Sequence, residues 1–509
     1  MKRAALLAVA VLVSGGTQGQ ESITLSAPST NGAPGRASGV LSLNSTNVLE
    51  GRAEVVNAQY LGETESRERA LSLLKNRLIK ERVEHVLKEF VDISGYFRAG
   101  YGRNDEGSSQ VPFQAPGAPA KYRLGNETEN YGELILAKDW YVPDLFTVDS
   151  RSPPGGASGE PIAHTQLRAA FLDPYSNYGS PDTFQTTLPE VWTSVGNVLP
   201  SQPSLKFWAG NRYYRRHDIH INDFYFLNMS GGGGGFEDLE LPFAKLALAW
   251  IGAGGQSGIF RDPILADPNN KAGFSKQNVD ISLYDIPLPL GKGEVALVYA
   301  NETGGRDASG TKAPDSDGVA LTFIHTRDRF IDENGINKFS LQLGYGAAKG
   351  FISGFETYAA TNGTFIVPDE PDSWRFRFTE HLVIQPNEHF SIGPALVYQY
   401  TNYRRALGKR HWLSAGVRPI IHFNKYFSLA LEGGVDYVDD SALRTHDYLY
   451  KVTFAPQVSL GNLFFSRPVI RAYATYGAWG NQFVGRVGGN DYINRKDGLA
   501  FGLQMETWW

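Results

Sequence analysis

The most constraining feature of the sequence is a two-residue alternation of apolar and polar side chains that recurs along residues 91–509. In the last segment, one row of alternate residues is apolar and ends in an aromatic side chain: Leu499, Phe501, Leu503, Met505, Thr507 and Trp509. The other row holds Gln504, Glu506 and Trp508. Because successive side chains of a β-strand point to opposite faces, the segment predicts a strand with one apolar and one polar face.

Similar short segments are separated by clusters of Gly, Asn, Asp and Pro, and no helical period persists after residue 90. No run approaches the ~20 apolar residues that a membrane-spanning helix needs, which excludes a helical membrane protein. The chain nevertheless combines 12% aromatic residues and 56 glycines with a mean hydropathy of only -0.28. A transmembrane β-barrel produces this combination, because lipid-facing and lumen-facing residues alternate along its strands.

The length of this region sets the number of strands. If each strand takes ~10 residues and each connection slightly more, about 18 antiparallel strands fit into residues 91–509. We therefore predict an all-β transmembrane barrel of 18 strands, with its polar faces turned to the lumen and its apolar faces in contact with outer-membrane lipid. A secreted β-sandwich or propeller, whose strands also alternate, is the alternative.

The first 90 residues differ from the rest of the chain in composition and in the spacing of their apolar residues. Lys2 and Arg3 precede an apolar stretch and then small residues, which predicts a signal peptide over residues 1–20 rather than a short buried helix. Residues 21–51 have the composition of a flexible linker. Within residues 52–90 the apolar side chains recur in steps of three and four, at Leu71, Leu74, Leu78, Ile79, Val83, Val86 and Phe90. This predicts a periplasmic helical extension that forms a coiled coil or packs on a neighbouring domain.

Composition excludes other classes of partner and cofactor. The chain has no Cys, so neither a disulfide nor a thiolate metal site is available. With 48 basic and 53 acidic residues it has no basic excess, which makes nucleic acid an unsuitable partner. His217 and His220 fall on opposite faces of an extended strand, so we expect no metal site and no cofactor. Gly231 to Gly235 lack a following Lys-Ser or Lys-Thr pair, and we expect a flexible, inward-folded loop there instead of a phosphate-binding loop.

Four separated motifs stand out: the run from Phe207 to Phe226, the run from Lys121 to Glu127, the run from Ser466 to Tyr476, and the last six residues from Gln504 to Trp509. Together they closely resemble the maltoporin family of bacterial outer-membrane sugar channels. The resemblance covers residues 91–509, and the helical extension before it is similar to that of the sucrose-porin branch. It implies a homotrimer of barrels in the outer membrane that passes maltose and maltodextrins by facilitated diffusion and is not an enzyme.

The resemblance also implies two rows of lumen residues that bind the sugar. Carried over residue by residue, an aromatic path comprises Tyr96, Tyr131, Phe465 and Trp508. A polar track comprises Arg98, Arg123, Glu133, Arg216, Asp218 and Asp223, with Tyr225 at the constriction. Arginine and carboxylate groups supply donors and acceptors that suit the hydroxyls of a sugar. Each of these charges also has a simpler interpretation, as one half of a lumen salt bridge.

Several positions depart from the family pattern, among them Thr128 at one position of the family's loop cysteine pair. Pro189 stands where the family has an arginine, Ile336 where it has an aromatic residue, and Asn228 where it has an acidic one. Arg216 and Tyr225 are retained, which favours the maltodextrin branch over the wider sucrose branch. A less selective sugar or sucrose porin and a secreted β-rich protein that binds or cleaves carbohydrate remain the alternatives, since 53 acidic residues offer many carboxylate pairs.

Overall fold

The computed structural model describes residues 91–141, 162–173, 184–254, 275–303, 315–360, 363–366, 371–404 and 408–509. The predicted signal peptide, linker and helical extension, residues 1–90, lie outside the described residues. None of the helices in these ranges is long and apolar enough to cross a membrane.

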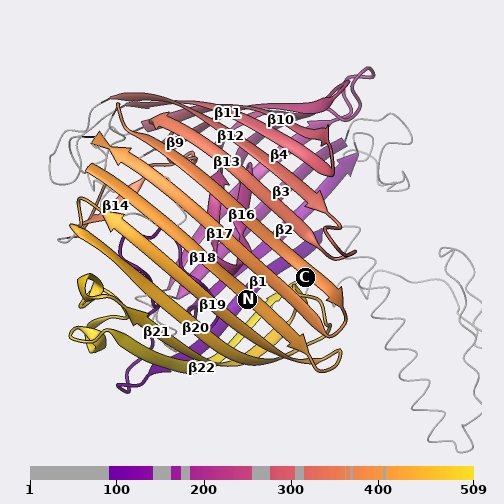
Figure 1. Ribbon diagram of the computed structural model, residues 1–509. Coiled ribbons are helices and arrows are strands. Elements are labelled where there is room, and N and C mark those ends of the chain that lie inside the picture. Colours follow the sequence, from indigo (N-terminus) through magenta and orange to yellow (C-terminus); the bar gives the residue numbers. More distant parts are fainter. Residues whose placement is uncertain are drawn as a thin grey trace, which may run out of the picture. The chain divides into compact units, whose positions relative to one another are not determined.

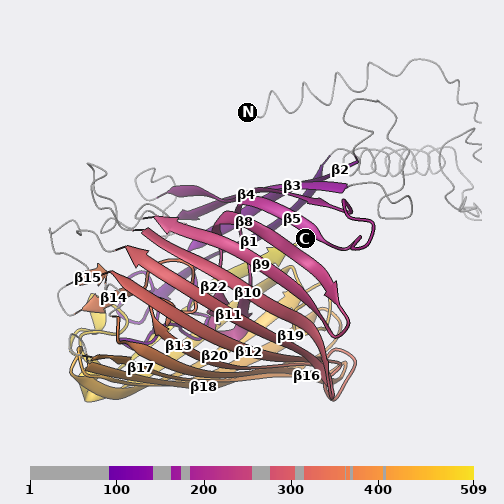
Figure 2. The same ribbon diagram turned by 90° about the horizontal axis from the view of Figure 1, so that it is seen from above.

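Eighteen strands form one antiparallel sheet that closes on itself, because the first strand, β1, pairs with the last, β22 (Figures 1 and 2). The strands of this barrel are β1 (Asp92–Asn104), β2 (Asn130–Tyr141), β3 (Ile162–Asp173), β4 (Gln185–Gly196), β5 (Lys206–Arg212), β8 (Gly231–Leu241), β9 (Ala244–Gly254), β10 (Ser275–Leu288), β11 (Gly291–Thr303), β12 (Ser316–Asp328), β13 (Ile336–Gly346), β16 (Trp374–Asn387), β17 (Phe390–Tyr403), β18 (Gly408–His422), β19 (Phe427–Asp440), β20 (Thr445–Ser459), β21 (Val469–Trp479) and β22 (Asp497–Trp508). The predicted 18-stranded antiparallel barrel is therefore confirmed.

Shorter elements lie in the connections. Two small hairpins are formed by β6 (Arg216–Ile219) with β7 (Phe224–Asn228) and by β14 (Thr357–Ala360) with β15 (Gly363–Ile366). Three short 3₁₀ turns are η2 (His220–Asn222), η3 (Asn481–Phe483) and η4 (Asn490–Tyr492).

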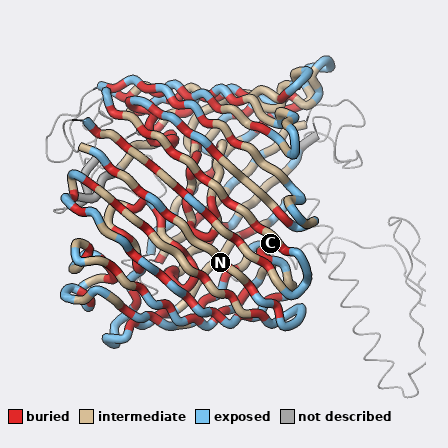
Figure 3. Tube along the Cα trace, in the orientation of Figure 1, coloured by how far each residue is buried: buried red, intermediate tan, exposed pale blue. Residues whose placement is uncertain are grey.

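Burial alternates along the strands with the period that the sequence predicts (Figure 3). In β20, for example, Lys451 and Thr453 are buried, whereas Val452 and Phe454 are exposed on the outer face. The same holds in β22, where Glu506 is buried and Leu503 is 63% exposed. The outer face of the barrel is thus apolar and the charged side chains point inward, as a barrel surrounded by lipid requires.

The expectation for the glycine run was wrong: Gly231 to Gly235 begin barrel strand β8 and do not form a loop. The reason is a close approach of β9. A Cβ atom on Gly233 would lie 2.0 Å from the carbonyl oxygen of Trp250, and one on Gly235 would lie 2.1 Å from that of Leu248. Glycine in a strand permits such an approach of two backbones, which single-sequence reasoning mistook for flexibility.

The long connection between β1 and β2 is not a free surface loop. Tyr122, at its centre, is only 2% exposed. Its ring fills the space left by two glycines of the wall, since a Cβ atom on Gly416 or Gly434 would lie 2.3 or 2.2 Å from ring atoms of Tyr122. The Tyr122 hydroxyl accepts a hydrogen bond of 3.1 Å from the Ser414 hydroxyl. This tyrosine therefore fixes the connection against β18 and β19.

We predict that Gly434→Val displaces Tyr122, because the added side chain would overlap its ring. Overpacking of this kind costs about 1–3 kcal/mol. Limited trypsin digestion of the detergent-solubilised protein should then show cleavage after Lys121. Gly433→Val is the control, since nothing lies within 4 Å of a Cβ atom there. Equal protection of Lys121 in both variants would contradict this account of the connection.

Candidate functional site

The hairpin β6–β7 lies in the connection between β5 and β8 and is held against the wall from within. Its apolar residues Ile219, Ile221 and Phe226 are buried. The carbonyl oxygen of Phe226 accepts hydrogen bonds from the side chains of Gln342, at 3.0 Å, and Arg377, at 2.7 Å. These contacts fix the hairpin across the barrel interior, so that its polar residues face the remaining lumen.

The turn of this hairpin lies between Asp218 and Asp223, which would face opposite sides of one continuous strand. Asp218 pairs with Tyr225 across the hairpin, and the 3₁₀ turn η2 separates Asp218 from Asp223. Asp223 closes the turn in a left-handed conformation with φ of 52°. This turn interrupts the strand between Asp218 and Asp223, so strict alternation does not decide which way their side chains face. Burial raises the pKa of Asp218 against the opposing charge of Lys338.

The aromatic residues that the sequence assigned to a path form one continuous series of ring contacts. The rings of Tyr131 and Tyr96 lie 5.9 Å apart, and Tyr96 stacks on Trp508 at 6.3 Å with an interplanar angle of 17°. His220 connects Trp508, at 6.3 Å, with Phe465, at 5.2 Å. The series therefore contains all four predicted aromatic residues, and it includes a histidine that the sequence analysis had considered only as a metal ligand.

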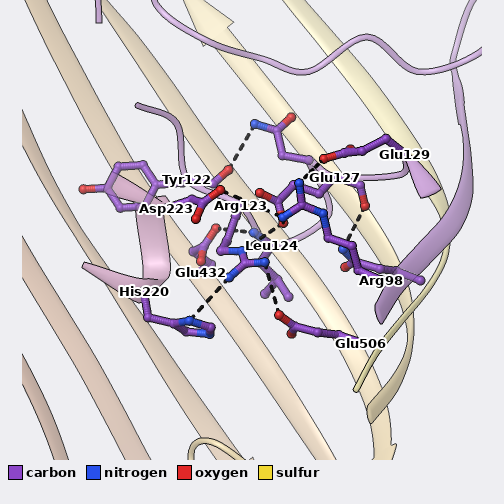
Figure 4. Close-up of polar contacts among 12 residues, drawn as sticks. Arg98, Tyr122, Arg123, Leu124, Glu127, Glu129, His220, Asp223, Glu432 and Glu506 are labelled. Carbon is purple, nitrogen blue, oxygen red and sulfur yellow. Dashed lines mark hydrogen bonds and ion pairs between the residues drawn. The ribbon is translucent and has the colours of Figure 1, made fainter. Parts of the chain in front are cut away.

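Arg123 stands at the centre of the polar contacts (Figure 4). Its guanidinium donates to Glu127 at 2.9 Å and to the Tyr96 hydroxyl at 3.0 Å, and it lies 3.1 Å from Glu506. The guanidinium also lies 3.4 Å from His220 Nδ1. Burial and this neighbouring charge hold the pKa of His220 well below its ordinary value, so the imidazole is neutral at neutral pH.

Arg98 extends the network from Arg123 towards the hairpin. It contacts Glu129 at 2.5 Å, Glu127 at 3.4 Å and Asp223 at 3.9 Å. Burial acts to raise the pKa of Glu127, but the guanidinium groups of Arg123 and Arg98 outweigh it and lower that pKa to about 2. This carboxylate therefore stays ionised over the whole physiological pH range.

Glu133 and Arg216 form the opposite end of the same network. Glu133 accepts hydrogen bonds from the Tyr131 hydroxyl at 2.5 Å and the Tyr213 hydroxyl at 3.3 Å. The guanidinium of Arg216 lies 4.0 Å from the ring centres of both Tyr213 and Tyr225. Arg216 is thus held between two aromatic rings, an arrangement that suits a planar guanidinium, which can stack on both faces.

All the predicted site residues are therefore brought together by contacts that run from Phe465 to Tyr225, although their part in sugar binding stays a prediction. Sequence reasoning missed several members of this cluster, among them Glu129, which lies outside the four motifs. Three others are His220, Tyr213 and Arg467, which lies 4.2 Å from the centre of the Trp508 ring. These three belong to the four motifs, so for them membership of a motif was the available signal. Among the described residues, no three His, Asp or Glu side chains gather as a metal site would require.

Comparison with known proteins identifies the class of barrel. The model of the LamB porin family matches residues 91–509. Similar solved structures include OccD3 (OpdP) of Pseudomonas aeruginosa, 9% identical, covering 83% of this chain and 91% of that chain with a TM-score of 0.40. OccAB1 of Acinetobacter baumannii is 8% identical, covering 82% and 96% with a TM-score of 0.44. OmpF of Salmonella typhi, in complex with daunomycin, is 10% identical, covering 82% and 97% with a TM-score of 0.41. The family of this chain is therefore given by the match over residues 91–509.

We predict that Glu506→Gln shifts the ion selectivity towards anions. Glu506 is 3% exposed and neutralises Arg123, Arg467 and Arg471, at 3.1, 2.5 and 3.2 Å. Removing its charge leaves excess positive charge in the lumen and destabilises the fold by about 3–5 kcal/mol, as expected when one partner of a buried pair is lost. The measurements are the reversal potential in a salt gradient and unfolding by urea in detergent.

Glu388→Gln is the matched control for this experiment. The Glu388 side chain is 75% exposed and lies between β16 and β17, outside the network. We expect its reversal potential and stability to equal those of the wild type. An unchanged reversal potential in Glu506→Gln would show that the positive charge left on the neighbouring arginines does not affect the ions that pass through the lumen.

Proposed function

Because the chain belongs to the LamB porin family over residues 91–509, we propose that this outer-membrane channel passes maltose and maltodextrin-type oligosaccharides by facilitated diffusion. We further propose that it works as a homotrimer, as the resemblance to maltoporins implies. The family supports a channel over the alternative of a secreted protein that binds or cleaves carbohydrate.

The observation that carries the proposal is the pairing of an aromatic series with a polar network around one lumen. Tyr131, Tyr96, Trp508 and Phe465 offer ring surfaces in succession, joined through His220. The apolar C–H face of a sugar ring can lie on such surfaces, while its hydroxyl groups reach charged side chains beside them. A sugar chain can then move from ring to ring.

Rapid passage requires that no single contact be strong. Conduction through a pore needs binding that is favourable enough for entry and weak enough for exit. The lumen charges fit this need because they are already paired with one another, as Arg123 is with Glu127 and Glu506. A sugar hydroxyl exchanges hydrogen bonds with groups that keep their partners, so it gains little from staying in place.

The constriction is proposed to select the substrate. Arg216 lies between Tyr213 and Tyr225, so these rings cannot move independently of it. A rigid opening admits a linear glucan chain and restricts bulkier sugars. Planar-bilayer recording with maltotriose and with sucrose tests this: stepwise closure of conductance triplets by maltotriose at lower concentration than sucrose is the expected result. Equal block by both sugars would favour a less selective sugar or sucrose porin.

We predict that Trp508→Ala raises the concentration of maltotriose needed for half-block about tenfold and leaves ion conductance nearly unchanged. Trp508 is 37% exposed, stacks on Tyr96 and lies in the middle of the aromatic series. A tenfold change corresponds to about 1.4 kcal/mol, the scale of one lost aromatic contact. Current-noise measurements at increasing maltotriose concentration give the half-blocking value.

Trp250→Ala is the control for the loss of a large aromatic side chain. Trp250 is 57% exposed. Its side chain lies on the outer face of β9, opposite to the face that carries the buried Ile251. Its removal should leave the half-blocking concentration unchanged. If Trp508→Ala behaves like Trp250→Ala, Trp508 does not belong to the sugar path; if no oligosaccharide blocks the wild type, the proposed substrate class is wrong.

A further inference from the structure

A cavity of about 270 Å³ lies beside the hairpin and is lined by none of the residues assigned to the aromatic path or the polar track. It opens between strands β8 and β10 on one side and the segment that leads into β6 on the other. Its lining residues are Arg212, Tyr214, Arg215, His217, Glu237, Asp238 and Tyr284.

An irregularity in β8 builds the acidic side of this cavity. Consecutive strand residues ordinarily face opposite sides of a sheet, yet Glu237 and Asp238 both line the cavity. The register of β8 against β9 shifts between Phe236 and Leu239, and Asp238 has a φ of 62°. Such bulges re-aim side chains and are frequent beside binding sites. The Tyr284 hydroxyl donates to Asp238 Oδ1 at 2.8 Å and so fixes the direction of that carboxylate.

The charges around the cavity balance. Arg212 pairs with Glu237 at 3.2 Å, Arg215 with Glu294 at 3.3 Å, and Lys206 with Asp238 at 3.0 Å. A charged ligand would find no excess of opposite charge here, so the site suits a neutral molecule. A neutral ligand that both donates and accepts hydrogen bonds matches this set of side chains.

Two arginines of the cavity wall each keep one donor without a partner in the part of the chain that the structure describes. The Nε–H groups of Arg212 and Arg215 are buried and have no hydrogen-bond partner among the described residues. Buried polar groups are normally satisfied, and an exception points to a missing partner. The carboxylate of Asp238 supplies acceptor oxygens on the same cavity wall. Hydroxyl groups can accept from the arginines and donate to the carboxylate, which is the pattern that a sugar presents.

We propose that this cavity is a second sugar subsite, which takes one pyranose unit of the transported saccharide. Pockets for drug-sized ligands span about 300–1,000 Å³, so the smaller volume suits a single sugar ring and not a chain. This inference rests on the proposed function of the channel. It adds a position at which a sugar is held beside the constriction, outside the aromatic series.

Equilibrium dialysis of radiolabelled maltose against the full-length protein in detergent tests this inference. We expect two saturable maltose sites per chain in the wild type. Asp238→Asn, which removes the charged acceptor without changing size, should lose about half of the maltose bound at saturation. Trp508→Ala should keep both sites but bind the other half about tenfold more weakly. Tyr284→Phe removes only the hydroxyl that orients Asp238 and should reproduce the loss even if Asp238→Asn folds poorly.

Asp285→Asn is the matched control. Asp285 also has a positive φ, of 52°, at a register shift in β10, but it does not line the cavity. It should retain both sites. A single site in the wild type that Asp238→Asn and Tyr284→Phe leave intact would overturn the second subsite and leave the channel function standing. No maltose bound to the wild type would overturn both.

Discussion

The rest of the structure depends on the closure of the sheet by hydrogen bonds between β1 and β22. A membrane provides no partners for free backbone groups, so an open sheet edge is not viable within it. Closure also builds the site, because it places Tyr96 opposite Trp508 and Arg98 opposite Glu506 in register. Residues from the two ends of the described barrel therefore meet in one lumen, and the aromatic series and the polar network both begin at this seam.

The interior is divided by chain segments that the wall itself holds in place. Tyr122 occupies a space left by Gly416 and Gly434, and the backbone N–H of Leu124, two residues further on, donates to the Glu432 carboxylate at 3.1 Å. The hairpin is held in the same manner through the Phe226 carbonyl. In both cases residues of the barrel wall contact a segment that folds inward. These contacts hold the segment in place and give the narrow lumen a defined shape.

Paired charges give this lumen its chemical character. Arg123 is surrounded by Glu127, Glu506 and His220, and Arg98 lies beside two further carboxylates, those of Glu129 and Asp223. Because the charges compensate one another, the interior is polar without a strong field of one sign. A neutral, hydroxyl-rich solute is the kind of molecule that such an interior accommodates, both along the aromatic series and in the cavity beside Asp238.

The sequence by itself predicted the barrel, the number of strands and the faces of side chains on the regular strands, because a two-residue period and the cost of a charge in lipid favour this assignment over a sandwich or propeller. It also placed Trp508 on the polar face. Only the tertiary structure decided which residues touch. His220 enters the aromatic series because a 3₁₀ turn breaks the strand period, and Gly231 to Gly235 form a strand because β9 approaches closely. The cavity at Asp238 follows from a bulge. Each is a local departure from regular alternation, set by contacts between distant segments that periodicity cannot reveal.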